Sequence, residues 1–473
     1  MVKKTDLQEV LAVAKKYGGD FAEVFIEKKN SSGIGLEADK IEKVVSGVDI
    51  GAGIRVITGE NTSYAYTNDL SLESLMKAAK IVAKSAGSKE SSVSINLSKE
   101  VKQDKVYVEK EPDTIPIDKK VEKVVAANKA AREVDDRIKQ VMAGYGDMVQ
   151  EVVIANSLGE IVEDKRIRTR FIVHSVAAEG SIIQTGYEAV GSFAGFELFD
   201  EVDAVEIAKT AAGRAVKMLE ARPAPSGKMP VVMTSKSGGT MVHEACGHGL
   251  EADLVQKKLS VYAGKKGQQV AAPEVTVVDD GTMKKYGYLT WDDEGVKSRK
   301  NTLIKNGMLE EFMYDRLTAM KENRESTGNG RRESYQNKPI PRMTNTYIDK
   351  GDTDPEKIIK ETKKGFLVEK MGGGQVNTTN GDFVFDVAEG YLIEDGEVKE
   401  AVRGATLTGN GPKVLSNIDM VGTDFGFAIG TCGKDGQGVP VSDAQPTLRV
   451  TELIIGGTEA PGSGPEIKRI RRL

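Results

Sequence analysis

The sequence predicts an α+β fold in two parts. A mixed α/β domain is expected over residues 1–222, followed by a largely antiparallel, barrel-like β domain over residues 228–473 with one helix embedded in it. The first half alternates helical and strand-like apolar patterns, whereas glycine-containing turn dipeptides divide the second half. Between them lies Arg222-Pro223-Ala224-Pro225-Ser226-Gly227, whose prolines cannot extend the preceding helix.

The first domain is expected to contain four helices joined by strands. Apolar residues three or four positions apart mark the first helix, and the pair Gly18-Gly19 ends it. The helices are predicted at residues 5–16, 71–87, 117–137 and 202–221. Strands are predicted at 21–26 and near 54–56, with two later strand pairs turning at 144–147 and 156–159. The polar stretch 88–116 is interpreted as connecting structure.

The second domain is expected to consist of hairpins. Asn-Gly and Asp-Gly dipeptides supply the positive φ angles of tight turns, and each lies between short apolar or β-branched runs. They occur at residues 280–281, 306–307, 380–381 and 395–396. One helix, at about residues 238–254, interrupts this pattern.

Composition excludes several classes of function. The chain has 473 residues, and 66 Lys+Arg against 71 Asp+Glu give a net charge of −5, too mild to predict a nucleic-acid or membrane partner. No apolar run approaches the roughly 18 residues that a membrane span needs. The first 18 residues have the pattern of an amphipathic helix and not of a signal peptide. With only two cysteines, a cytoplasmic protein is expected.

The histidines are concentrated in one place. The chain has three, and two of them, His243 and His248, fall within six residues on the predicted helix at 238–254, with Glu244 directly after the first. Imidazole nitrogens suit a borderline ion such as zinc, and a carboxylate beside the first ligand can take a proton from water. The pattern is therefore a candidate metal site with Glu244 as its base.

The spacing of this motif makes a structural demand. On a regular helix, residues five apart point about 140° away from each other, so His243 and His248 could not share an ion. A π-type turn, or an end of regular helix at Gly247, would bring them together, and Gly247 and Gly249 permit unusual backbone angles. We therefore expect a distorted helix near Gly247.

Spacing alone does not identify a third ligand. Cys246 lies within the helix but is equally suited to pack as a small apolar side chain. Glu251, three residues after His248, and Cys432, in a distant glycine-rich loop, are the other candidates. The alternative to a metal site is a surface helix whose Glu and His are solvated. The remaining histidine, His174, is interpreted as structural.

Four segments in the second half resemble the TldD family of zinc-dependent peptidases, within the TldD/PmbA group. They are MVHEACGHGLEAD (241–253), RRESYQNKPIPRMTNTYI (331–348), GGGQVNTTNGDFVFDVAEGYLIEDGE (372–397) and GTCGKDGQGVPVSDAQPTLRV (430–450). The resemblance implies that His243, His248 and Cys432 bind zinc and that Glu244 is catalytic. Non-catalytic TldE/PmbA relatives lack the histidine motif, so the resemblance implies a catalytic subunit.

The resemblance also implies a substrate class and a partner. Family members cleave unfolded or extended peptides in a chamber formed by two subunits, so we expect a peptide or unfolded-protein substrate, and either a TldE-like partner or a homodimer. The glycines of segment 372–377 are candidates to hold a peptide backbone, with an ordinary surface turn as the alternative. The alternative function for the chain is that of a TldE-like scaffolding subunit in which the histidine motif is vestigial. Substrate or subunit contacts are predicted for Arg331, Arg332, Tyr335 and Arg342.

Overall fold

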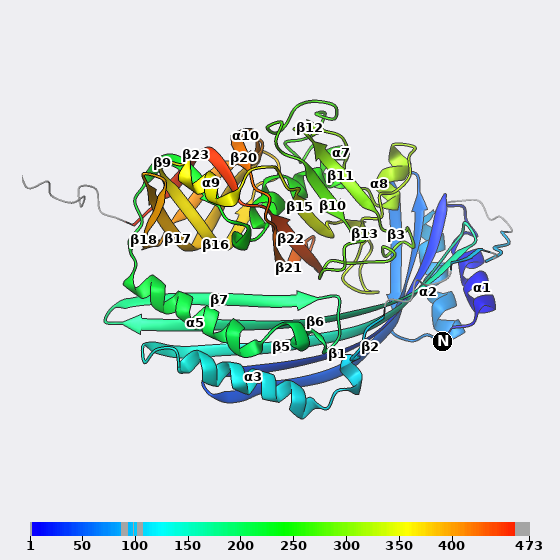
Figure 1. Cartoon of the computed structure of the whole chain (residues 1–473). Coiled ribbons are helices and arrows are strands. Elements are labelled where there is room, and N and C mark those ends of the chain that lie inside the picture. The colour runs from blue at the N-terminus through cyan, green and yellow to red at the C-terminus, as the bar shows by residue number, and fades with distance from the viewer. Residues whose placement is uncertain (1, 87–92, 98, 102–106, 459–473) are drawn as a thin grey trace, which may run out of the picture.

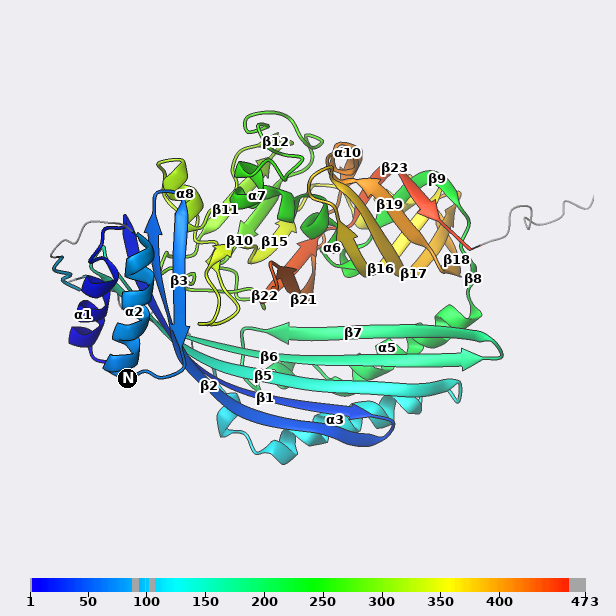
Figure 2. The ribbon, with the colours of Figure 1, turned by 180° about the vertical axis from the view of Figure 1, so that it is seen from behind.

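The computed structural model describes residues 2–86, 93–97, 99–101 and 107–458. The first half forms one long, curved, seven-stranded sheet, shown in Figures 1 and 2. Its strands are β1 (Phe21–Glu37), β2 (Lys40–Thr58), β3 (Asn61–Thr67), β4 (Lys99–Val101), β5 (Ile138–Asn156), β6 (Glu160–Glu179) and β7 (Ile182–Ser192). The hairpin strands alternate side chains between two faces, so one face is available to helices and the other to the second half of the chain.

Four helices cover parts of this sheet. α3 (Ile117–Arg132) and α5 (Ala204–Glu220) bury small alanine-rich faces against β5 and β6, in a core that includes Phe171 and Val173. At the other end of the sheet, α1 (Lys4–Ala14) and α2 (Leu72–Ala86) form a second core with β1 and β2. The short α4 (Leu198–Glu201) precedes α5. Figure 1 shows the second half of the chain along the β7 side of the sheet.

The second half contains a closed barrel. β16 (Lys364–Val376), β9 (Gly227–Met233), β23 (Leu448–Gly456), β19 (Thr406–Asn410) and β17 (Asp382–Glu394) pair in that order, and β17 pairs back to β16. β18 (Glu397–Arg403), β8 (Arg222–Pro223) and β20 (Ile418–Val421) extend it. Phe366, Phe383 and Phe385 are buried in its core.

A six-stranded sheet lies beside the barrel and has the order β12–β11–β10–β15–β22–β21. The strands are β10 (Val277–Asp280), β11 (Lys300–Lys305), β12 (Met308–Leu309), β15 (Asn345–Ile348), β21 (Gly426–Lys434) and β22 (Gln437–Gln445). A two-stranded pair, β13 (Gly330–Arg331) and β14 (Ile340–Pro341), lies apart from it. The helices of this half are α6 (Thr240–Val242), α7 (Ala252–Gln256), α8 (Arg316–Lys321), α9 (Pro355–Lys360) and α10 (Gly411–Ser416).

The α+β class and the barrel-like second half are confirmed. The four predicted helices are present, although α3 ends at Arg132 instead of near residue 137. The predicted turns at 156–159, 306–307 and 395–396 join β5 to β6, β11 to β12 and β17 to β18. Part of the stretch predicted as connecting structure, at 88–92, 98 and 102–106, lies outside the described residues.

Two predicted turns are wrong. Residues 144–147 lie inside the continuous strand β5, because their glycines are extended and pair with β1 and β6. At residues 280–281 there is no tight hairpin: the Asp280 carboxylate accepts hydrogen bonds from Thr282 and begins a long connection to β11. The loop at 380–381 does join the antiparallel pair β16 and β17, but it extends over residues 377–381.

The described strands before and after α5 belong to different sheets, and the two-residue β8, directly after α5, pairs with β18 of the second half. We keep the division into domains 1–222 and 228–473 as a proposal on this ground. Among the described residues, no helix is long and apolar enough to cross a membrane.

A buried ionic network joins the two halves. Glu23 of β1 accepts from Arg55 of β2 at 3.1 Å and from Arg332 of the second half at 2.6 Å. Arg55 also pairs with Glu294. These four side chains are at most 4% exposed. Each guanidinium meets carboxylates, so the network is close to neutral.

Candidate metal centre

The backbone around the two clustered histidines departs from a regular helix. One turn of π-helix covers His243–Gly247, between α6 and a turn of 3₁₀-helix at His248–Leu250. The His248 N–H donates to the His243 carbonyl, five residues back, which places the two side chains on the same side. Gly247 has no side chain where Met343 packs, since an added Cβ would lie 2.2 Å from the Met343 sulfur. The predicted distortion near Gly247 is confirmed, and the predicted single helix at 238–254 is broken.

Three potential ligand atoms converge at this turn. His243, His248 and Cys432 each offer one atom, and these atoms lie within 4.8 Å of one another. Cys432 comes from β21, and its sulfur is 3.5 Å from Nε2 of His248. A tetrahedral ion with nitrogen and sulfur ligands needs such a spacing, and three protein ligands leave a fourth position open.

Each histidine is oriented by a carboxylate. Nδ1 of His243 lies 2.8 Å from the Asp443 carboxylate on β22, and Nδ1 of His248 lies 3.1 Å from Glu251. Because Nδ1 of each ring is engaged, Nε2 is left for a metal, an arrangement that metal-ligating histidines usually show. The donor set therefore fits a metal ion.

The two cysteines differ sharply. Both are buried and free. Burial opposes a thiolate at Cys432, but His243 and His248 outweigh it and lower the thiol pKa to about 5. Burial with no such partners raises the pKa of Cys246 to about 12, and its sulfur contacts the Val242 carbonyl. Only Cys432 has the electrostatic surroundings of a thiolate ligand.

Glu251, the other candidate ligand, is committed elsewhere. It is fully buried and contacts His248, Lys434 and, at 4.0 Å, Arg342. Burial opposes its ionisation, yet Lys434 and His248 hold the pKa of Glu251 at about 2. It therefore supports a histidine and does not converge with the three ligand atoms. His174 lies outside the group as well, with its ring edge-on to Tyr187.

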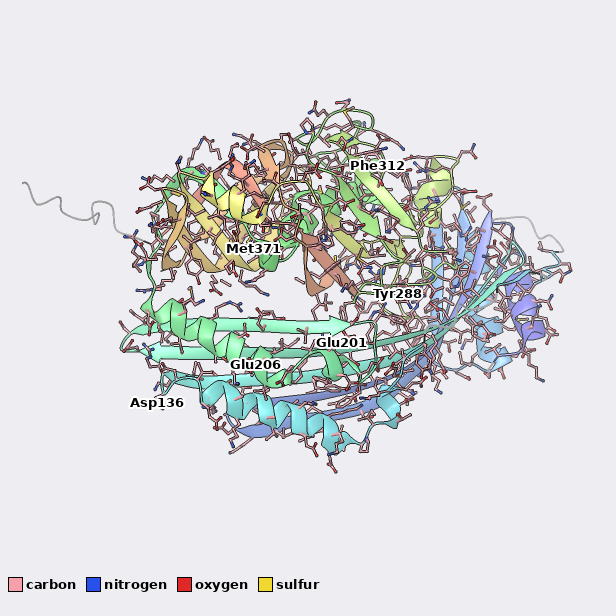
Figure 3. All side chains as sticks on the ribbon, in the orientation of Figure 1. Asp136, Glu201, Glu206, Tyr288, Phe312 and Met371 are labelled. Atoms are coloured by element: carbon pink, nitrogen blue, oxygen red, sulfur yellow. The ribbon has the colours of Figure 1, made fainter. Side chains whose placement is uncertain are left out.

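The three ligand residues open on a cleft of about 1060 Å³ between β7, β16 and β21. Glu244 lines it, and burial raises the pKa of this carboxyl. Gly372, Gly373 and Gly374 line it too, as part of strand β16 and not as a surface turn. Met371, labelled in Figure 3, marks this wall of the cleft.

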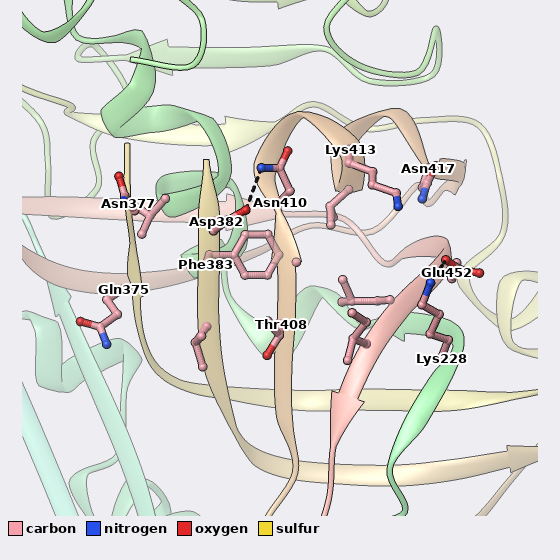
Figure 4. A pocket seen from close by; sticks show the side chains of 16 residues that line it. Lys228, Gln375, Asn377, Asp382, Phe383, Thr408, Asn410, Lys413, Asn417 and Glu452 are labelled. Atoms are coloured by element: carbon pink, nitrogen blue, oxygen red, sulfur yellow. Dashed lines mark hydrogen bonds and ion pairs between the residues drawn. The ribbon is translucent and has the colours of Figure 1, made fainter. Parts of the chain in front are cut away.

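A second hollow, of about 640 Å³, lies against the barrel strands (Figure 4). Its lining has no histidine or cysteine, and its carboxylates are engaged: Glu452 pairs with Lys228, and Asp382 accepts from Asn410. It has none of the ligand chemistry found in the cleft.

The four residues predicted as substrate or subunit contacts all make contacts within the chain. Arg331 donates to the carbonyls of Met343 and Pro440, and Arg342 to those of Gln437 and Cys432. Arg332 belongs to the buried ionic network described above. Tyr335 is 3% exposed, and its ring packs over Gly51. Pattern alone did not show that these polar side chains hold the chain together internally.

Sequence reasoning missed Asp443 and Lys434. Asp443 is 200 residues from its partner His243, and Lys434 binds both Glu251 and Asp253. Both lie on the β21–β22 hairpin that carries Cys432, within a segment that matched the family, but no spacing rule links them to the histidines.

Comparison with known proteins decides the family. Models of the PmbA/TldA metallopeptidases match residues 22–86 as domain 1, 110–219 as the central domain and 226–457 as the C-terminal domain. The chain belongs to this family. It is thus a metallopeptidase with a metal cofactor.

Relatives that are named as metalloproteases support the same family. The chain is 38% identical to a metalloprotease TldD homolog of Haemophilus influenzae, over 93% of both chains. It is 34% identical to a metalloprotease of Methanothermobacter thermautotrophicus, over 93% of this chain and 96% of that one. A zinc metalloprotease TldD homolog of Saccharolobus solfataricus is 29% identical, over 94% and 98%.

The fold is similar to the crystal structure of TldE from Thermococcus kodakarensis. The TM-score is 0.75 at 22% identity, over 96% of this chain and all of that one.

Proposed function

We propose that the chain is a zinc-dependent peptidase of the HExxxH type, with zinc held by His243, His248 and Cys432 and with Glu244 as the general base. The observation that carries this proposal is the convergence of three ligand atoms within 4.8 Å, with a carboxylate on Nδ1 of each histidine. A histidine pair with one thiolate suits zinc.

A zinc ion held there would supply a Lewis acid for the peptide carbonyl and would acidify water. Glu244 takes the proton from that water and delivers it to the leaving amine. Its half-buried carboxyl has a raised pKa, which brings it closer to the neutral range in which a base can also return the proton. Asp443 and Glu251 keep the imidazole rings oriented.

The substrate is proposed to be an unfolded or extended peptide. Among the described strands, β7 and β21 each pair on one side only, and both border the cleft. Free strand edges and the glycine backbone of β16 offer main-chain hydrogen bonds with little selection of side chains.

A second chain of the same fold, either a TldE-like subunit or another copy, is proposed as the partner. The outer stretch of β2, residues 40–50, is exposed and unpaired on its far side among the described strands. Val44, Val45 and Val48 on it are 47–65% exposed, which is unusual for valines on a sheet. Because the thiol of Cys432 must stay free, a reducing compartment, the cytoplasm, is the proposed location.

Chelation tests the proposed function. Protein purified without chelators should contain about one zinc per chain and cleave a mixture of unfolded peptides. A chelator should abolish cleavage, and zinc should restore it. The scaffolding alternative predicts no bound metal and no cleavage, whereas cleavage that persists after complete metal removal would contradict the mechanism.

A further inference from the structure

A second polar pocket, of about 350 Å³, adjoins the cleft. It lies between β5 and β6 of the long sheet and loops of the second half. Its cationic lining residues are Lys29, Arg166, Arg168, Arg170, Arg331 and Arg332, and its acidic lining residues are Asp147, Asp293 and Glu333. We call it the arginine pocket. Thr431, the neighbour of Cys432, lines both this pocket and the cleft, so the two spaces share a wall.

Strand geometry explains why the arginines gather. Arg166, Arg168 and Arg170 alternate along β6, so they project from one face. Phe171, on the other face, lies in the core with α3 and α5, so the arginines face the second half of the chain. Opposite Arg170, Gly146 leaves room for the guanidinium, since an added Cβ would lie 3.3 Å from Nε.

Part of this positive charge is already neutralised. Arg166 pairs with Asp164 and Asp293, and Arg332 pairs with Glu23. These two arginines belong to the buried ionic framework of the protein and are not available to a ligand.

The other arginines make no hydrogen bond or ion pair with a carboxylate of the described residues, although Asp293, which also lines the pocket, favours the charged forms of Arg168 and Arg331. Arg168 donates only to the carbonyls of Tyr286 and Tyr288, at 2.7 and 2.6 Å; Tyr288 is labelled in Figure 3. Arg331 likewise donates only to carbonyls. Arg170 is exposed, and its side chain makes no hydrogen bond or ion pair with any residue that the structure describes.

Arg168 and Arg331 are each 2% exposed. Burial lowers their pKa values, to about 10 and about 9, and the charge of Arg166 adds to the effect on Arg168, as that of Arg168 does on Arg331. Proteins rarely bury a cation without a counter-charge. Asp293 is already paired with Arg166, so a bound anion would supply the further negative charge.

We propose that the arginine pocket binds a carboxylate of the peptide substrate through Arg168, Arg170 and Arg331. This proposal rests on the proposed function in taking the ligand to be a peptide. The carboxylate comes from the C-terminus of the peptide or from an acidic side chain. Guanidinium groups match carboxylates in shape and charge, and the shared wall at Thr431 lets one peptide reach both the cleft and the arginine pocket.

Binding of uncleaved peptide tests this directly. Glu244→Gln protein is titrated with a fluorescent peptide that has one glutamate and a free C-terminus, with its C-terminal amide, and with its Gln-for-Glu analogue. Loss of the bound carboxylate should raise Kd about tenfold. A loss with the amide identifies the α-carboxylate, and a loss with the glutamine analogue identifies an acidic side chain. Equal Kd values for all three peptides would overturn the proposal.

A matched pair of variants locates the contact. In the same background, Arg170→Gln should bind all three peptides with similar Kd, whereas Arg170→Lys keeps most of the discrimination. Arg299→Gln removes the same charge from another exposed arginine outside both pockets and should behave like the parent. Discrimination that is unchanged in Arg170→Gln contradicts the assignment.

The two proposals fail in different ways. If the wild type cleaves peptides but the three peptides bind with equal Kd, only the proposed role of the arginine pocket is contradicted. If the three peptides bind with different Kd values but the wild type cleaves none of them, only the proposed peptidase function is contradicted.

Discussion

Two buried polar clusters of the molecule differ in whether their polar atoms already have partners. In the network of Glu23, Arg55, Glu294 and Arg332, every charged group meets one of opposite sign, and the cluster is closed to solvent. In the centre at His243, His248 and Cys432, each histidine has one nitrogen held by a carboxylate while the remaining ligand atoms point at one another and at a cleft. Burial and shifted pKa values occur in both. The functional cluster differs from the structural one in two ways: its ligand atoms converge without partners that satisfy them, and they line an open cleft.

The same substitution at one glutamate of each cluster makes this contrast measurable. Glu244→Gln removes the proposed base without breaking any hydrogen bond or ion pair found among the described residues, so kcat should fall about 10³-fold, with unchanged zinc content and melting temperature. Activity assays beside metal analysis check this. Wild-type kcat in this variant would show that another group moves the proton.

Glu23→Gln should have the opposite profile. Loss of its charge leaves Arg55 and Arg332 buried with fewer carboxylates, which should lower the free energy of unfolding by about 3 kcal/mol. Urea denaturation measures this loss, and the folded variant should still bind one zinc. If stability is unchanged while metal is lost, the two clusters are not independent.

Asp443→Asn tests whether the carboxylates beside the histidines matter to the metal. An asparagine can still hydrogen-bond Nδ1 of His243 but no longer supplies charge, so zinc affinity should fall about 10- to 100-fold. Competition with a fluorescent chelator gives the affinity. An unchanged affinity would mean that the ring is oriented by packing alone.

Glu389→Gln probes a third ionic contact, between α5 and the barrel. Burial of Glu389 is outweighed by hydrogen bonds from Lys217, Tyr391 and Arg214, which lower its pKa from 4.5 to about 2. Because the pKa of this carboxyl is lower in the folded than in the unfolded state, its ionised form stabilises the fold at pH values above the unfolded-state pKa. This stabilisation is lost as the pH falls toward 2. The variant should therefore be about 2 kcal/mol less stable at pH 7, with the difference vanishing near pH 2. A difference that is constant over this range would exclude the charge as its cause.

Sequence reasoning predicted the parts of this molecule that depend on local pattern. Periodicity predicted the helices, and the five-residue histidine spacing predicted a distortion near Gly247, which the structure shows as a π-turn at His243–Gly247. It failed where an interaction joins distant segments: Gly144 and Gly146 looked like a turn because their pairing with β1 and β6 is not visible locally. Asp443 was missed for the same reason, and the ion pair of Arg332 with Glu23, 309 residues away, could not be predicted. Resemblance, not spacing, selected Cys432 over Glu251.

The central claim is that Cys432 and the two histidines hold one zinc ion, and the metal content of two cysteine variants tests it most directly. The chain has two cysteines, so the second serves as a matched control for the first. Cys432→Ser removes the proposed thiolate ligand, and Cys246→Ser changes the same side chain within the histidine motif itself. Elemental analysis of protein purified without chelators should find about one zinc per chain in the wild type and in Cys246→Ser, and little in Cys432→Ser. Full zinc occupancy in Cys432→Ser, or its loss in Cys246→Ser alone, would contradict the account.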